Sequence, residues 1–211
     1  MESSNVRFLM RALVPAIVTC LLSAASARAD ERIDDRADDR ADDRAAIESV
    51  LLAYWQGFGA QDFEAAARTI HPGDLEELRV QVLPVFLAGL KAPKSDRRAL
   101  AQAFFAGVPE ADRERLSGAD TFVQFSKLVA RLKPDVVNAL AGKTPEVVEV
   151  SIANDGSASA TYRFVILDSP STDTDRFSRV NGRWYPRLKE APRDTAQKFR
   201  TLFAPGPDAG H

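Results

Sequence analysis

The hydrophobic pattern of this chain changes its period once, near residue 144, and that change limits the folds it can adopt. Over residues 47–58 apolar side chains recur three and four positions apart, which is the period of an amphipathic helix. Over residues 158–166 they alternate with polar ones, which is the period of a strand with one buried face. A run of helices followed by a run of strands predicts an α+β fold, in which helices cover one face of an antiparallel sheet.

Start and stop signals divide the first part into short helices. Gly57 and Gly59 end the first helix, Pro72-Gly73 ends the second, and Asp74 with Glu77 forms a capping box for the third. Asp62 is predicted to be a turn or cap residue before the second helix, and Ser117 with Asp120 is predicted to cap the helix that follows them. The predicted helices span residues 47–58, 63–70, 74–86, 95–104, 117–132, 134–140 and 192–203, with a further short helix after Pro109.

The second part is predicted to be a meander of about four strands. These strands are expected over residues 148–152, 158–166, 174–180 and 183–188, with a loop around Pro170. In the first of them Val148, Val150 and Ile152 alternate with polar residues and are expected to share one face. Asn181-Gly182 is a strong signal for a two-residue hairpin. That hairpin places Arg179 opposite Trp184, where a cation–π contact fits, and it buries Trp184 while Tyr185 faces the other side.

The first 29 residues have the order of a secretory signal peptide. Basic residues precede an apolar run over residues 12–25, and a small-x-small sequence ends at Ala29. The run is shorter than the ~20 residues of a membrane-spanning helix, which argues against a retained anchor. Acylation of Cys20 is a further alternative, but apolar sequence continues past that residue. We expect cleavage between Ala29 and Asp30, a periplasmic or secreted protein, and no membrane span after cleavage.

The composition restricts the chemistry of the mature chain. Cys20 is the only cysteine and leaves with the signal peptide, so a disulfide, a catalytic thiol and a thiolate metal site are all excluded. The two histidines are His71 and the terminal His211, so a zinc site with several histidines cannot form. A Ca²⁺ or Mg²⁺ site made of carboxylates alone is the remaining alternative, but no calcium-loop pattern is present. We therefore expect no metal and no cofactor.

Residues 30–45 are predicted to be a charged, low-complexity spacer. They contain the unit Asp-Asp-Arg-Ala three times in tandem, and Ile33 is their one aliphatic side chain larger than alanine, so they are expected to bury little. A docking or cation-binding tail is the alternative. The residues that follow carry equal numbers of basic and acidic side chains, which argues against a nucleic-acid partner. We expect the folded domain over residues 46–203 and a disordered tail over residues 204–211.

Several stretches resemble the NTF2-like superfamily, including its SnoaL-like branch. Residues 46–55, 59–66 and 70–72 look like its first two helices, and residues 157–164 and 180–185 look like its C-terminal strands. The helices around residues 75–141 depart from the family pattern, in which many members have an early strand pair. The resemblance implies a cone in which a curved sheet wraps over a long helix and encloses a pocket. The fold serves both enzymes and non-catalytic binding or dimerisation modules.

Four residues are candidates to line the pocket that the resemblance implies: Tyr54, Trp55, His71 and Tyr162. Tyr54 and Trp55 lie on the apolar stripe of the first helix, where a core role is the default. His71, at the end of the second helix, is a weak candidate for a general base, and a role at the helix terminus is the alternative. Tyr162 is expected to face inward.

The predicted strands place no acidic residue at an inward position, and Asp175, at a strand start, comes nearest. Isomerase-like chemistry needs a buried carboxylate base. The sequence therefore favours a non-catalytic module that binds a small apolar ligand or a protein partner, with a homodimer through the outer face of the sheet as one form. A SnoaL-like enzyme that uses acid–base chemistry in the pocket is the alternative.

Overall fold

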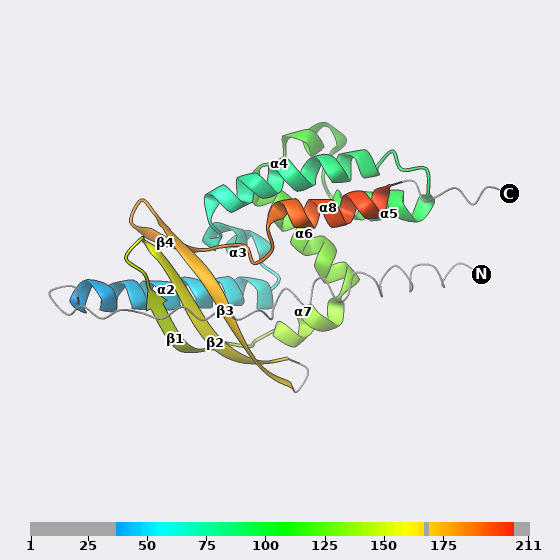
Figure 1. Ribbon diagram of the computed structural model, residues 1–211. Coiled ribbons are helices and arrows are strands. Elements are labelled where there is room, and N and C mark those ends of the chain that lie inside the picture. Colours follow the sequence, from blue (N-terminus) through cyan, green and yellow to red (C-terminus); the bar gives the residue numbers. More distant parts are fainter. Residues whose placement is uncertain (1–36, 167–168, 205–211) are drawn as a thin grey trace. The chain divides into compact units, whose positions relative to one another are not determined.

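The computed structural model describes residues 37–166 and 169–204, which fall into two compact units. The sheet unit comprises residues 37–52 and 145–189, and the helical unit comprises residues 53–144 and 190–204. Helices and a curved, four-stranded antiparallel sheet make an α+β architecture, as predicted (Figure 1). The predicted signal peptide with Cys20, and the tail beyond residue 204, lie outside the described residues.

The sheet is a meander in which each strand pairs antiparallel with the next. Its strands are β1 (Glu146–Ile152), β2 (Ser157–Ile166), β3 (Ser169–Val180) and β4 (Arg183–Pro186), and they lie in that order. The face that carries the buried Ala160, Tyr162 and Phe164 of β2 is called the inner face. The outer face carries the intervening side chains, of which Arg163 is exposed.

Strand β1 departs from the predicted alternation at Val148. Val147 pairs with Tyr162 and Glu149 pairs with Thr161, so Val148 is an extra residue in a β-bulge. Val148 is 44% exposed, whereas Val147 is half-buried. The prediction that Val148 shares a face with the residues that follow is wrong, because a bulge adds one residue to a pattern of period two.

Strand β3 begins earlier than predicted, at Ser169 instead of residue 174, so Pro170 lies within a strand and not in a loop. Pro170 is near the start of β3, and β4 pairs only with the distant end of that strand, from Phe177 to Val180. Proline is tolerated at such a position, where a neighbouring strand lies on one side only. The longer strand brings Asp173 into the sheet and places Asp175 in the interior of the strand instead of at its start.

The hairpin between β3 and β4 forms as predicted. Asn181 and Gly182 both have positive φ, 50° and 80°, as the favoured two-residue turn requires. Arg179 pairs with Trp184, and its guanidinium lies 5.7 Å from the centroid of the indole ring. Trp184 is 3% exposed, and Tyr185 is half-buried beside Ser178, its partner in the register. The predicted burial of Trp184 is confirmed.

Helix α2 (Ala37–Gly59) begins inside the segment predicted to be a spacer. Asp43 accepts a hydrogen bond of 2.8 Å from the Trp184 indole and forms an ion pair of 3.2 Å with Arg179. Asp43 precedes the fully buried Ile47 and Leu51 by one and two helical turns, so it continues their stripe. The expectation of little burial fails at Asp43, because a polar contact holds it against Trp184.

Local signals explain most boundaries in the helical unit. Its further helices are α3 (Phe63–Thr69), α4 (Pro72–Gly89), α5 (Ser95–Phe104), the 3₁₀ helix η2 (Glu110–Arg115), α6 (Gly118–Leu132), α7 (Pro134–Leu140) and α8 (Pro192–Phe203). The Asp62 side chain caps α3, and Ser117 with Asp120 forms the predicted capping box of α6. In residues 37–166 and 169–204, no helix has both the length and the apolar composition to cross a membrane.

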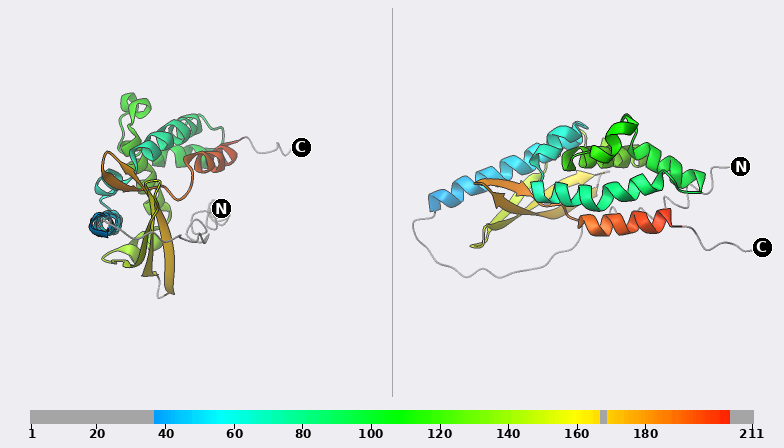
Figure 2. Two further views of the ribbon diagram at one scale, coloured as in Figure 1. Left: turned by 60° about the vertical axis from the view of Figure 1, so that its left-hand side comes forward. Right: turned by 90° about the horizontal axis from the view of Figure 1, so that it is seen from above.

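Helix α4 lies beside α8 and also contacts α6 (Figure 2). Phe86 of α4 stacks on Phe104 with ring centroids 4.1 Å apart, and its ring also lies 4.7 Å from that of Phe199 of α8. Phe86 and Phe104 are fully buried. Packed aromatic side chains therefore form the core of the helical unit.

Candidate functional site

Two acidic side chains lie buried on the inner face of the sheet. Along β3, Asp173, Asp175 and Phe177 alternate with polar residues, and these three side chains are 8%, 3% and 1% exposed. The prediction that no acidic residue occupies an inward strand position is therefore wrong. It failed because the strand was predicted to start at residue 174, which left Asp173 in a loop and Asp175 at the start of the strand.

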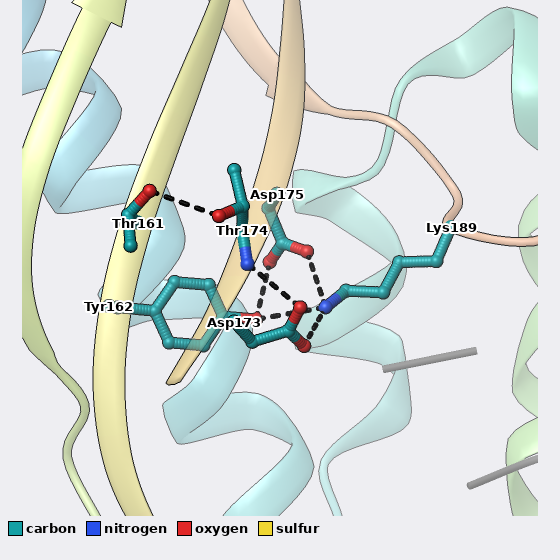
Figure 3. A network of polar contacts seen from close by, with 6 residues as sticks. All are labelled: Thr161, Tyr162, Asp173, Thr174, Asp175 and Lys189. Atoms are coloured by element: carbon teal, nitrogen blue, oxygen red, sulfur yellow. Dashed lines mark hydrogen bonds and ion pairs between the residues drawn. The ribbon is translucent and has the colours of Figure 1, made fainter. Parts of the chain in front are cut away.

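Tyr162 and Lys189 complete a cluster with these two carboxyl groups (Figure 3). Tyr162 lies opposite Asp173 in the register, and its hydroxyl donates a hydrogen bond of 2.9 Å to Oδ2 of Asp175. The Lys189 ammonium donates to Oδ2 of Asp173 and, at 3.3 Å, to the Tyr162 hydroxyl. It also lies 3.0 Å from Oδ1 of Asp175. We call Tyr162, Asp173, Asp175 and Lys189 the inner-face cluster.

The backbone and the outer face hold the cluster in place. Oδ1 of Asp173 accepts a hydrogen bond of 2.7 Å from the backbone N–H of Thr174, which fixes the direction of that carboxyl group. On the outer face the hydroxyls of Thr174 and Thr161 lie 3.0 Å apart and tie β3 to β2 (Figure 3). Ala160 is opposite Asp175 in the register, and its small side chain adds little bulk beside the carboxyl group.

Burial changes the acidity of one member of the cluster. Removal from water raises the pKa of Asp175 above its ordinary range, because the charged form loses hydration. The Lys189 ammonium and the hydrogen bond from Tyr162 oppose this rise, and the charge of Asp173 adds to it. A carboxyl group with a raised pKa that sits beside a cation and a hydroxyl can exchange a proton at a pH closer to neutrality than a free aspartate can.

The four predicted pocket residues fall in both units. Tyr162 belongs to the sheet unit and to the inner-face cluster, whereas Tyr54, Trp55 and His71 belong to the helical unit. Tyr54 is half-buried and its ring lies 4.9 Å from that of Phe58. Trp55 is 8% exposed. Both side chains thus pack as members of the aromatic helix face predicted for residues 47–58.

His71 has a structural role at the start of α4. It is the N-cap residue, not the end of the preceding helix, because Pro72 occupies the first turn of α4. Its Nδ1 accepts a hydrogen bond of 3.2 Å from Gly73 N–H and lies 3.6 Å from Oδ1 of Asp74. Asp74 is 4% exposed and lies inside the first turn, so the predicted helix start at Asp74 is wrong.

Sequence reasoning missed the roles of four residues of these networks, which are Asp43, Asp173, Asp175 and Lys189. The alternation of Asp173, Asp175 and Phe177 was available as a strand signal, but the neighbouring proline, serine and threonine residues are typical of loops. Asp43 could have been found from its spacing of four residues before Ile47. Lys189 carried no signal, because it lies in the connection between β4 and α8 and reaches the cluster only through the tertiary fold.

Comparison with protein-family models, with curated proteins and with solved structures finds no match to this chain. Within the part of the chain that the structure describes, no three His, Cys, Asp or Glu side chains gather as ligands for a metal ion. The inner-face cluster itself contains two carboxylates and a lysine, and the ammonium occupies the position between the carboxylates.

Proposed function

We propose that the protein is an exported, NTF2-like domain that acts on a small molecule by acid–base chemistry, with Asp175 as the proton-carrying group. The observation that carries the proposal is the burial of Asp175 on the inner face, in contact with Tyr162 and Lys189. Buried ionic clusters are often no more stabilising than apolar packing of the same volume. Three ionisable groups and a tyrosine in one buried cluster therefore favour a chemical role over a purely structural one.

The proposed step is the reversible transfer of a proton from a carbon next to a carbonyl group. The Asp175 carboxylate takes up the proton, the electron pair of the C–H bond moves toward the carbonyl to form an enolate, and Asp175 then returns the proton to the substrate. A cation held between the two carboxylates, at the position that the Lys189 ammonium occupies in the structure, stabilises the negative charge that develops nearby. The step needs no metal or redox partner, because a proton is removed and given back.

Deuterium exchange tests this proposal without knowledge of the natural substrate. The full chain is incubated in D2O with a panel of enolisable ketones and amino ketones, and incorporation of deuterium is measured by mass spectrometry. We expect exchange above the buffer rate that falls at least about 100-fold in Asp175→Asn, the usual scale for loss of a general base. The matched control is Glu149→Gln, an exposed residue of β1. Equal exchange rates in Asp175→Asn and the wild type would overturn the proposal.

A second candidate is a non-catalytic module that binds a ligand or partner. The observation that favours it is the contact of Lys189 with both carboxylates and with Tyr162, because its positive charge offsets part of the negative charge of the cluster. In this case no compound exchanges deuterium, and Asp175→Asn changes only binding or stability. A homodimer through the sheet belongs to this candidate, because Val148 and Val165 are 44% and 46% exposed. Light scattering of the full chain measures the oligomeric state.

A further inference from the structure

The inner-face cluster surrounds one ammonium group with oxygen atoms. Within 3.3 Å of Nζ of Lys189 lie the Tyr162 hydroxyl, Oδ1 of Asp175 and Oδ2 of Asp173. The nitrogen is 5.6 Å from the centroid of the Tyr162 ring, on the side of its hydroxyl. A primary ammonium has three N–H donors and no acceptor, so three oxygens are the groups that recognise it.

Lys189 serves three oxygens with one ammonium group. Asp175 is 3% exposed, and its Oδ1 lies 3.0 Å from the ammonium, which also contacts Oδ2 of Asp173 and the Tyr162 hydroxyl. A primary ammonium has three N–H donors, so an amine that replaced Lys189 would have to supply the same three donors to these oxygens.

Lys189 is also the most exposed member of the cluster. Its side chain is 25% exposed, against 8% for Asp173 and 4% for Asp175 in the same ion pairs. It lies in the connection between β4 (Arg183–Pro186) and α8 (Pro192–Phe203), outside the regular elements that hold Tyr162 and both aspartates. The ammonium can therefore leave toward solvent while the oxygens that contact it stay fixed in the sheet.

We propose that the inner-face cluster is a binding site for a small molecule with a primary ammonium group, and that Lys189 is its displaceable internal occupant. The inference rests on the proposed function in that it names the substrate class for the same site. An incoming ammonium replaces a charge by an equal charge, so the carboxylates are never left without a cation. The two carboxylates disfavour anions, and a quaternary ammonium lacks the N–H donors that the oxygens require.

The first experiment supplies a free amine to a variant that lacks the Lys189 ammonium group. Lys189→Ala removes the atoms that n-propylammonium carries, and the full chain is titrated with n-propylammonium chloride while its melting temperature is recorded. We expect a saturable rise with n-propylammonium and none with tetramethylammonium at the same ionic strength. The double variant Lys189→Ala/Asp175→Asn should lose at least about tenfold in affinity. If Lys189→Ala does not fold alone, refolding in the two salts is the measurement, and recovery with neither salt contradicts the proposal.

The second experiment separates a displaceable occupant from a permanent ion pair. Binding of n-propylammonium to the wild-type chain is measured by saturation-transfer NMR, without turnover. We expect saturable binding at least about tenfold weaker than in Lys189→Ala, because the tethered lysine competes. Absence of binding to the wild type would show that Lys189 never leaves and would overturn the inference. If the amine fails to bind while Asp175-dependent deuterium exchange persists, only this inference falls. Amine binding without exchange would instead overturn the proposed acid–base chemistry.

Discussion

Asp43 carries more of the sheet unit's stability than its place in a low-complexity repeat suggests. We expect Asp43→Ala to lower the free energy of unfolding by about 1–3 kcal/mol, because the buried Trp184 indole N–H loses its acceptor and Arg179 loses its carboxylate. Urea unfolding followed by tryptophan fluorescence measures the change. Asp42→Ala is the matched control in the same repeat, and its exposed side chain should contribute less than about 0.5 kcal/mol. Equal losses in the two variants would contradict the role of Asp43.

Asp175 makes stability depend on pH. Because its pKa is raised in the folded state, folding is favoured when the group is protonated. This contribution is fully present below the ordinary value of 3.8 and is lost as the pH rises through the raised pKa. Residue 175 cannot ionise in Asp175→Asn. The free energy of unfolding of this variant should therefore rise relative to that of the wild type as the pH increases from about 4. Urea unfolding at a series of pH values measures the difference, and a constant difference would contradict the prediction.

At the scale of the element, the β3–β4 hairpin decides which aromatic side chain is buried. Trp184→Ala should lower the free energy of unfolding by about 3–5 kcal/mol, the usual cost of removing a large buried aromatic side chain. Tyr185→Ala, on the opposite face, is the control and should cost markedly less. Chemical denaturation of both variants makes the comparison. A larger loss for Tyr185→Ala would mean that the register is displaced by one residue.

The contact between α4 and α6 depends on the absence of a side chain. A Cβ atom on Gly118 would lie 2.6 Å from the backbone carbonyl of Leu75, and the backbone cannot yield as a side chain can. We expect Gly118→Ala to lower the melting temperature, with an unfolding penalty of about 1–3 kcal/mol or more. Gly73→Ala is the control, because its new Cβ would meet only the His71 ring at 3.0 Å. Calorimetry compares the two, and an unchanged melting temperature for Gly118→Ala would refute the close approach.

At the scale of the whole molecule, the charged segment of residues 30–45 has two parts, one before α2 and one that forms the first turns of α2. A chain that lacks residues 30–36 should keep its melting temperature, because the sequence there has almost no apolar side chains to bury. A chain that lacks residues 30–44 loses Asp43 and the first turns of α2, and its melting temperature should fall by about 2–10 °C. Differential scanning calorimetry measures both. Equal melting temperatures would mean that the whole segment is dispensable.

The candidate site could be predicted only in part. Tyr162 was placed inward from the alternation of β2, since period two follows from local backbone geometry. The two buried carboxylates were not predicted, because the limits of a strand depend on its partner strand. Pairing with β2 extends β3 past Pro170, a residue that by itself indicates a loop. Lys189 and Asp43 reach their partners across long stretches of chain. The spacing of Asp43 before Ile47 indicates its helix face, but no local pattern identifies Trp184 as its partner or Asp173 as the partner of Lys189.

The sequence by itself determined the α+β class, the order of helices and strands, the caps of α3 and α6, and the tight hairpin, because each depends on side chains within a few residues of one another. Only the tertiary structure decided where β1 bulges, where β3 begins, and which charged groups are buried together. These features arise where strands exchange hydrogen bonds and where an ion pair offsets the cost of leaving water. That balance is set by partners in space, which is why Asp173, Asp175 and Lys189 meet on a face that the local pattern marks as apolar.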